Sequence, residues 1–549
     1  MKEKRLSGIG TGIVLAACFS FLMFVYAPLE LYITNISEFW VKLSELVFPI
    51  VALFFLSFIG LTAALIISRL INENFYSVCL AIGFSLLLGA YIQGNFLVKN
   101  LPSMDGLNFV WSDYPLERLK SVLAFVLPLI ILIIILIKIK SEKFKKIVSV
   151  ASTCFIILFV ITLTTLFITT DTKKSDAVIA TVSDEFKMSS DQNLVMLVLD
   201  TVNCEDFEKA LKNDPEYEET FDGFTFFDNA LAAYPHTKHA VPIILSGKWY
   251  KNDSNFTEYQ IDAINNSPVF TTLAEQKYHT GLYEKSTFVL PKESCEVKLD
   301  NYSSVKVAYD SSAIYQFVIK LGGVKFFPWD MKNYCWYLEG YSQYFQKFES
   351  DTESFKWEDD LFYSEISERN PITVVNEKCA RIIHLQGAHF PFAFDKELNK
   401  ITSGSYEQNI EACYTLVKKY INRLKESSVY DNSAIVILGD HGYNGVTDGT
   451  YDSLKGRMNP LLMVKGVNEK HNIGFSDAPV SYEDIADSIK NLLSGKMSTE
   501  IFNYSDGDTR TRKTILYFVN DSNTMIEYIT NGRADDIDAM KPSGEEYKR

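Results

Sequence analysis

The sequence predicts a polytopic α-helical membrane domain followed by an α/β domain, and two observations support this prediction. Long apolar runs are confined to the part of the chain before residue 172. After residue 193, short apolar strands alternate with amphipathic stretches, which is typical of a layered α/β sheet. With 549 residues, the chain is also too long for one ordinary domain.

The first domain, residues 1–172, is expected to contain five transmembrane helices. Each apolar run reaches, or nearly reaches, the roughly 20 residues needed to cross the hydrocarbon core of a bilayer. The runs cover residues 8–34, 42–68, 76–97, 121–137 and 147–170. The first follows Lys2, Lys4 and Arg5, as a signal peptide would, but it lacks a clear small-residue cleavage site. We therefore expect it to be retained as an anchor.

Basic residues predict the orientation of these helices. The loop between the fourth and fifth runs contains Lys138, Lys140, Lys143, Lys145 and Lys146. Because cytoplasmic loops are enriched in Lys and Arg, this loop and the basic amino terminus should be cytoplasmic, although Lys99, Arg118 and Lys120 weaken the bias. We expect a multi-pass protein of the cell membrane whose large carboxy-terminal part is extracytoplasmic.

The charge of the chain argues against a nucleic-acid partner. The net charge is −15, and all of the acidic excess lies after residue 172. A nucleic-acid-binding surface would be basic; ordinary solubility explains the acidic balance better. Cysteines 204, 295, 335, 379 and 413 follow no paired spacing, so the sequence indicates neither a zinc finger nor a redox motif.

The part after the membrane domain is expected to have three sections. Residues 173–192 read as an interfacial linker or a plain tether, with one weak helical face formed by Ala177, Val178, Ile179, Val182 and Phe186. Residues 193–500 are the predicted α/β domain, in which 310–365 form a helical insertion beside the site, as a lid or by surface packing. Residues 501–549 are a small closing subdomain of one or two strands followed by charged coil.

Three segments of the α/β domain predict one metal site. The buried strand 193–199 ends at Asp200, and the strand 434–438 is followed by Gly439, Asp440 and His441. Ligands collect at the carboxyl ends of strands in open α/β sheets. Two carboxylates and an imidazole suit a hard or borderline divalent cation, with a fourth position open.

Thr237 is the candidate nucleophile and fourth ligand. It precedes an apolar helical run, so we expect it to cap a helix that begins at Lys238, where the positive helix end favours phosphate. Coordination would lower the pKa of its hydroxyl and favour attack on phosphorus or sulfur. Taken alone, a threonine at this position is usually only a cap, and Asp-His-Gly after a strand is often only a turn.

Several further residues are candidates for contacts with the substrate. Five of the seven histidines fall in these segments: His236, His239, His384, His389 and His441. His389 is placed to bind a phosphoryl oxygen or to protonate a leaving alkoxide. His384 lies inside a strand and is alternatively a core residue. Lys238 and His239 adjoin Thr237, and Lys455 and Arg457 could pair with lipid phosphate, although exposed basic residues are usually solvated.

These residues resemble the alkaline phosphatase superfamily, in its membrane-anchored sulfatase-like branch of lipoteichoic acid synthases and phosphoethanolamine transferases. Asp440-His441-Gly442 matches the signature of that branch, and Thr237 stands where its threonine nucleophile belongs. Asp200 replaces the glutamate that many of these transferases use as first ligand. The resemblance implies a mixed sheet sandwiched by helices and one divalent metal ion, manganese or zinc. Formylglycine sulfatases have Cys/Ser-x-Pro-x-Arg where this chain has Pro235-His-Thr-Lys-His239.

The sequence therefore favours a metal-dependent transferase that works through a phosphothreonine intermediate. The expected donor is a membrane phospholipid, the acceptor is a cell-envelope polymer or glycan, and glycerol phosphate is the first choice of transferred group. The alternatives are phosphoethanolamine transfer, hydrolysis of a phosphodiester or sulfate ester, and a catalytically silent module that binds envelope polymers.

Overall fold

The computed structural model describes residues 8–36, 41–98, 114–170, 172, 177–254, 256–285, 296–309, 311–336, 346–349, 353–368, 371–445, 449–518 and 521–548. Lys2, Lys4, Arg5, Lys99, Cys295 and residues 173–176 of the predicted linker lie outside these ranges. The chain divides into two compact units. We call them the membrane unit (Met1–Asp176 with Lys306–Glu349) and the sheet unit (Ala177–Val305 with Ser350–Arg549).

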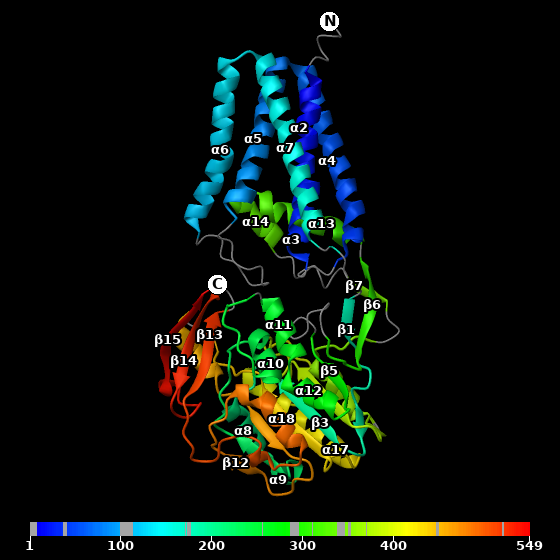
Figure 1. Cartoon of the computed structure of the whole chain (residues 1–549), viewed down its shortest axis with the longest axis vertical. Coiled ribbons are helices and arrows are strands. Elements are labelled where there is room, and N and C mark those ends of the chain that lie inside the picture. The colour runs from blue at the N-terminus through cyan, green and yellow to red at the C-terminus, as the bar shows by residue number, and fades with distance from the viewer. Residues whose placement is uncertain are drawn as a thin grey trace. The chain divides into compact units, whose positions relative to one another are not determined.

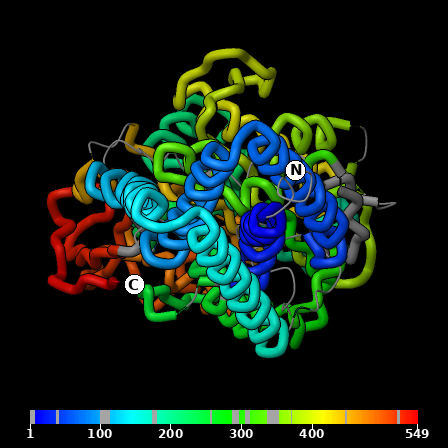
Figure 2. Tube along the Cα trace, turned by 90° about the horizontal axis from the view of Figure 1, so that it is seen from above, coloured from blue at the N-terminus to red at the C-terminus, as the bar shows by residue number. Residues whose placement is uncertain are grey.

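The membrane unit contains five helices that are long and apolar enough to cross a bilayer, as the sequence predicts (Figure 1). The first, Ile9–Thr34, is α2 (Ile9–Phe21), one π-helical turn (Leu22–Tyr26) and α3 (Ala27–Thr34). The others are α4 (Leu43–Ile71), α5 (Glu73–Phe96), α6 (Pro115–Lys138) and α7 (Ser141–Thr169). Helix α2 lies among α4, α5 and α7, and it is the dark blue coil in the end-on view of Figure 2. Apolar side chains such as Phe48 and Leu56 on α4 are more than 70% exposed, as lipid-facing residues would be.

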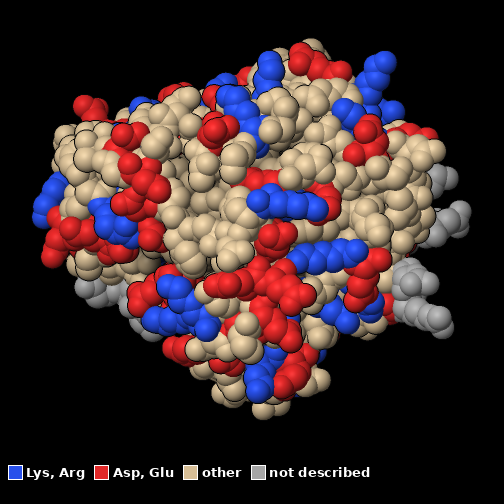
Figure 3. All heavy atoms as spheres, turned by 90° about the horizontal axis from the view of Figure 1, so that it is seen from below, with Lys and Arg blue, Asp and Glu red and all other residues tan. Residues whose placement is uncertain are grey.

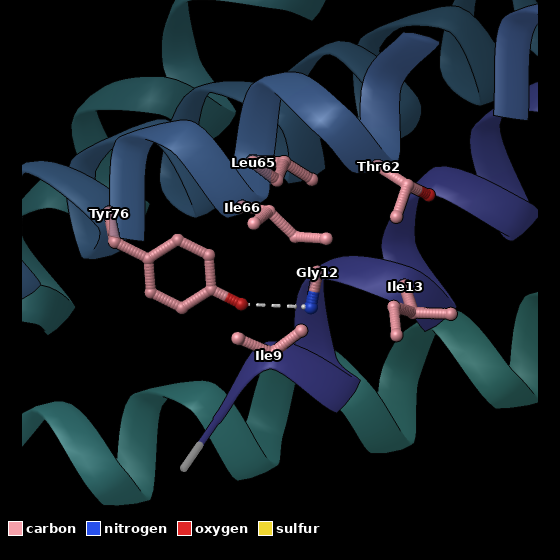
Figure 4. A pocket seen from close by; sticks show the side chains of 7 residues that line it. All are labelled: Ile9, Gly12, Ile13, Thr62, Leu65, Ile66 and Tyr76. Carbon is pink, nitrogen blue, oxygen red and sulfur yellow. Dashed lines mark hydrogen bonds between the residues drawn. The ribbon is translucent and has the colours of Figure 1, made fainter. Parts of the chain in front are cut away.

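Tyr76 fixes the first turn of α2 against α5. Its hydroxyl donates to the Gly8 carbonyl oxygen (2.7 Å) and accepts from the Gly12 amide (3.0 Å). These atoms border a small hollow lined by Ile9, Gly12, Ile13, Thr62, Leu65, Ile66 and Tyr76 (Figure 4). A Cβ on Gly12 would lie 2.8 Å from the tyrosine oxygen, so this contact requires glycine.

Two helices of the predicted insertion belong to the membrane unit. Helices α13 (Ser311–Phe326) and α14 (Trp329–Trp336) pack on helices α3, α4, α5 and α6. The apolar face of α13 packs against the membrane helices, so these two helices of the expected insertion belong to the membrane unit and not to the sheet unit. Of the predicted segment, α16 (Asp359–Ser367) lies in the sheet unit.

A seven-stranded mixed sheet forms the centre of the sheet unit. Its strand order is β12 (Gly474–Ser476), β4 (Phe224–Phe227), β11 (Leu462–Lys465), β10 (Ser433–Gly439), β3 (Asn193–Leu199), β9 (Cys379–Leu385) and β5 (His279–Tyr283). Strands β10, β3, β9 and β5 are parallel, whereas β11 is antiparallel to both β10 and β4. The carboxyl ends of the four parallel strands therefore meet at one edge.

Helices cover both faces of this sheet, as expected. Leu194, Met196 and Val198 of β3 pack with α10 (Thr237–Ser246), α11 (Phe256–Asn265), α12 (Pro268–Glu275) and α18 (Ile485–Leu493). The alternate residues Val195, Leu197 and Leu199 pack with α8 (Cys204–Lys212), α16 and α17 (Tyr406–Glu426). The period of two along a strand that is buried on both faces explains why β3 reads as an unbroken apolar run.

Smaller sheets replace two sequence-based expectations. The helical face predicted over residues 177–186 is wrong: β1 (Ala177–Ala180) pairs antiparallel with β6 (Tyr302–Tyr309), and β6 pairs with β7 (Gln346–Glu349). Strand β2 (Lys187–Ser189) follows and pairs with β8 (Thr373–Val375). The predicted charged coil at the carboxyl end is also a strand, β15 (Met540–Lys548), in an antiparallel sheet with β13 (Arg512–Phe518) and β14 (Asp521–Thr530). Such strands depend on partners distant in sequence, which local periodicity does not report.

Acidic and basic side chains alternate over the surface in Figure 3, and Asp and Glu occupy broad areas between Lys and Arg. The cysteines that the structure describes, which include Cys204, Cys335, Cys379 and Cys413, are free thiols.

Candidate metal centre and nucleophile

Asp200 and Asp440 lie side by side because their strands are in register. Leu199 of β3 pairs with Gly439 of β10, so the next residue of each strand emerges at the same carboxyl edge. The side chains of Asp200, Asp440 and His441 are all buried, and one potential ligand atom from each lies within 4.8 Å of the others. The sequence-predicted ligand set is thus brought together.

The hydrogen bonds of His441 and Asp440 suit a metal ion. The His441 Nδ1 atom lies 2.8 Å from the Gly442 carbonyl oxygen, so Nδ1 carries the proton and Nε2 has a lone pair. Nε2 lies 3.7 Å from Asp200 Oδ1 and 3.6 Å from Asp440 Oδ2. Among the described residues, no hydrogen-bond partner reaches the buried Oδ2 of Asp440. This donor set fits one divalent cation, which Asp200, Asp440 and His441 would hold.

The electrostatics of the centre point the same way. Burial, followed by repulsion from Asp440, raises the pKa of Asp200 above its usual range. A buried cation would relieve both effects, since it compensates the desolvated charge and the repulsion between the two carboxylates.

Thr237 is the first residue of α10, and its side chain points to the centre. Its hydroxyl donates to Asp200 Oδ2 (3.2 Å) and lies 3.4 Å from His441 Nε2. The prediction that Thr237 caps the helix is wrong by one position, because His236 is the N-cap residue. The threonine oxygen is therefore available for the centre, since it does not serve the helix backbone.

Thr201 was missed by sequence reasoning, although it adjoins Asp200. Its φ is 63°, which is unusual for a β-branched residue and costs of order 1–3 kcal/mol. In this conformation its hydroxyl donates to Asp200 Oδ1, its amide donates to Asp440 Oδ1 (3.0 Å), and its carbonyl accepts from the Tyr406 hydroxyl (3.0 Å). Thr201 thus orients both carboxylates, and its side-chain type gives no signal of the left-handed backbone.

The loop after β9 carries His389 and is fixed to Asp200. The Ala388 amide donates to the Asp200 carbonyl (2.9 Å), and Gly387 has a φ of 62°. Asp359, at the start of α16, accepts from the amides of Gln386 (2.7 Å) and Gly387 (2.8 Å). Asp359 is a second residue that the sequence did not assign. Its only sequence signal is its position before an amphipathic run.

The rings of His384 and His389 both lie next to Trp357. The ring centroids of His384 and His389 lie 5.7 and 5.5 Å from that of Trp357. Burial lowers the pKa of His384 to about 4 and also lowers the pKa of His389. The His389 Nδ1 atom donates to the Phe390 carbonyl, which leaves Nε2 as a proton acceptor.

Arg457 is the last residue of the segment Tyr451–Arg457 and lies next to His236. Its guanidinium is held by Asn444 Oδ1 (3.0 Å) and His236 Nδ1 (3.3 Å). His236 in turn donates from Nε2 to the Tyr517 carbonyl (3.1 Å). Burial, followed by the Arg457 charge, lowers the pKa of His236 well below its usual value, so the ring is neutral and accepts from Arg457.

The structure places the other three predicted substrate contacts away from the ligand atoms. His239 is buried among aromatic rings, with Nδ1 2.6 Å from the Tyr517 hydroxyl. The Lys238 ammonium lies over the Phe256 ring at 4.6 Å. Lys455 pairs with Asp452 (3.0 Å) and lies over Tyr528. The structure describes no hydrogen bond from these three residues to Asp200, Asp440 or His441.

Comparisons with known proteins identify the family of this chain. A family model described as Sulfatase matches residues 192–495, and no curated protein sequence matches the chain. The solved lipoteichoic acid synthase LtaP from Listeria monocytogenes is similar with a TM-score of 0.36 and 15% identity, covering 64% of this chain and 88% of that chain. A putative sulfatase from Bacteroides fragilis gives a TM-score of 0.38 and 12% identity, with 62% and 84% covered. Because the family model covers more than half of the chain and includes Asp200, Thr237, Asp440 and His441, the chain belongs to the sulfatase family.

Proposed function

We propose that this protein transfers a phospho-head group from a membrane lipid to an extracytoplasmic envelope polymer or glycan through an ester on Thr237. Glycerol phosphate is the proposed group. The observation that carries the proposal is the position of the Thr237 hydroxyl, 3.2 Å from Asp200 Oδ2 and 3.4 Å from His441 Nε2. A divalent cation held there, manganese or zinc, would lower the pKa of the hydroxyl and offset charge at phosphorus.

The reaction has two balanced steps. In the first, the Thr237 oxygen forms a bond to phosphorus, the bond from phosphorus to the diacylglycerol oxygen breaks, and the threonine proton leaves with the diacylglycerol. In the second, an acceptor hydroxyl attacks phosphorus and the bond to Thr237 breaks. His389 Nε2, a proton acceptor in this tautomer, takes the acceptor's proton and gives it to the threonine oxygen as that oxygen leaves phosphorus, so His389 ends neutral and Thr237 ends as the free hydroxyl.

Arg457 is proposed to bind the phosphoryl oxygens. Its guanidinium is half-buried and oriented by Asn444 and His236, so little rotamer entropy is lost when an anion binds. Together with the amino end of α10, which favours anions, it would hold the phosphoryl group over Thr237.

A membrane-lipid donor is supported by the five membrane helices of the same chain. Anchoring limits the search for a lipid to the bilayer surface. A sulfatase reaction that uses formylglycine is disfavoured because Thr237 stands where such enzymes carry a cysteine or serine that is converted to the aldehyde.

The test is peptide mass spectrometry of Thr237 in the full-length protein purified from membranes. We expect the peptide to carry an added mass that corresponds to an esterified glycerol phosphate group. An added mass that corresponds to phosphoethanolamine would identify a different donor lipid and would leave the proposed mechanism unchanged. Thr237→Ser should retain the adduct and part of the turnover, whereas Thr237→Ala should lose both. Turnover retained in Thr237→Ala would overturn the assignment of the nucleophile.

A measurement of bound metal distinguishes a transferase from a hydrolase and from a catalytically silent module. Asp440→Ala should lose both bound metal and turnover. Unmodified Thr237 in a protein that binds stoichiometric metal and cleaves lipid without an acceptor would indicate a hydrolase. A protein without metal or turnover, in which Thr237→Ala keeps its biological role, would indicate the silent binding module.

A further inference from the structure

We propose that the helical pair α13–α14 is a second membrane anchor, which lies in the head-group region of the bilayer with its exposed edge against lipid. The chain leaves the sheet unit after Val305, forms this pair within the membrane unit and returns at Ser350. This inference rests on the membrane helices and not on the proposed reaction.

The buried face of α13 is part of the apolar core of the membrane unit. Ile314, Phe317, Val318 and Leu321 are 0–6% exposed, and they pack against apolar residues of the first two spans: Tyr32, Ile33, Leu46 and Ile50. Positions 314, 317, 318 and 321 lie on one helical stripe. This face would be exposed to water if the pair left the membrane helices.

Close backbone approach supports the same docking. A Cβ on Gly322 would lie 2.5 Å from the carbonyl oxygen of Met23 in the first span. A Cβ on Gly94 of α5 would lie 2.3 Å from the Phe326 ring. Both glycines therefore permit contacts that any larger residue would prevent.

Charged and polar contacts place the pair at the ends of the spans. Lys325 forms an ion pair with Glu30, one turn before the end of the first span. On α14, Asp330 pairs with Arg118 (2.8 Å) and the Trp329 amide donates to Ser121 Oγ (2.9 Å). Arg118 lies in the first turn of α6, a 24-residue helix about 36 Å long, so it reaches the head groups when the helix spans the roughly 30 Å hydrocarbon core.

The two helices of the pair are fixed to one another. The fully buried Lys332 of α14 donates through Nζ to the carbonyls of Val324 and Lys325, in the last turn of α13. The two helices are therefore expected to move together as one rigid element.

The exposed edge of the pair carries both apolar and polar side chains: three large hydrophobic residues lie beside the exposed Ser312, Gln316, Asp330 and Asn333. Ile319 is 39%, Met331 45% and Tyr334 74% exposed. On α6, where α14 is attached, Leu116 and Leu119 are 56% and 54% exposed. An amphipathic element at this level, with a tyrosine at its edge, has the composition of an interfacial helix.

The first test measures contact with lipid in the full-length protein in liposomes. A fluorescent amino acid would replace Tyr334 or, separately, Met331, and nitroxide lipids would report depth. We expect strong quenching by nitroxides at the head group and upper chain. The same probe at Leu56 on α4 should be quenched, and one at the exposed Lys396 of the sheet unit should not be. A probe at 334 reached by aqueous iodide but not by lipid nitroxides, or by neither because protein covers it, would overturn the proposal.

The second test measures anchoring. A protease site placed at residues 172–176 would be cut in intact membranes. We expect the fragment with the sheet unit to remain in the membrane pellet through high-salt washing, because it still contains α13–α14. In a matched Val318→Glu chain, which places a charge in the docked face, the cut fragment should be released. Release of the wild-type fragment would overturn the proposal.

Discussion

Replacing Gly387 with alanine tests whether the loop that carries His389 holds the backbone of Asp200 in position. Gly387 has a φ of 62°, and a Cβ there would lie 2.4 Å from the carbonyl oxygen and 2.6 Å from the amide nitrogen of Asp200. A left-handed backbone costs alanine about 1–2 kcal/mol. Forced overlap in a packed region costs about 1–3 kcal/mol more. Because the overlapping atoms belong to the backbone, they cannot move without moving Asp200.

Gly495→Ala provides the matched control. Gly495 also has a positive φ, 87°, but its Cβ would meet no described atom within 4 Å. It should therefore cost only the conformational penalty, about 1–2 kcal/mol. The difference between the two variants isolates the collision with Asp200.

The assay is thermal melting of the full-length protein together with calorimetric titration of manganese and zinc. We expect Gly387→Ala to lower the melting temperature by about 4–10 °C, at about 2 °C for each kcal/mol. Its metal affinity should fall roughly 10–100-fold, as when a residue that supports a ligand is lost. Equal melting temperatures for the two variants, with unchanged metal affinity, would refute the reasoning.

Three further predictions concern residues around the centre. Burial raises the pKa of Asp359 to about 7, so the stability that its protonated form contributes is fully present below about pH 4 and is lost as pH rises through 7. The melting temperature of the wild-type protein should therefore fall between about pH 4 and 7 relative to that of Asp359→Asn. A difference between the two melting temperatures that stays constant with pH would contradict this. Tyr517→Phe removes the 2.6 Å hydrogen bond to His239, which lies two residues after Thr237, and leaves a buried polar group unpaired at a cost of about 1–3 kcal/mol. This variant should lower kcat about tenfold at unchanged metal content, and an unchanged kcat would contradict the prediction. Arg457→Met should raise KM for the lipid donor, whereas Lys455→Met should leave KM unchanged because Lys455 pairs with Asp452; equal effects on KM would show that the two residues are equivalent.

The candidate metal centre can be predicted from the sequence where its residues follow strands with a clear sequence pattern. A strand buried on both faces is an unbroken apolar run, so the ends of β3 and β10, and with them Asp200 and Asp440, are visible without a structure. Thr237 is visible for the same reason, because an apolar helical run follows it.

The supporting residues depend on contacts between distant segments. Thr201 matters through its backbone conformation, Asp359 through two amides 27 and 28 residues away, and Tyr517 through a helix 278 residues earlier. No local pattern encodes these pairings. The α13–α14 pair illustrates the same limit. The sequence predicts a helical insertion over residues 310–365, but it does not show that the apolar face of α13 packs on membrane helices.

The strand order has a consequence for folding during synthesis. Strands β3, β4 and β5 precede α13–α14, and in the seven-stranded sheet none of these three pairs with another. Their partners β9, β10, β11 and β12 all follow residue 350. While the chain is synthesised from its amino end, these three apolar strands must therefore wait with unpaired edges until the second half arrives, an interval in which they can aggregate or need a holding chaperone. During that interval, α13–α14 can already dock on the preceding spans, because both helices are made before β9, β10, β11 and β12.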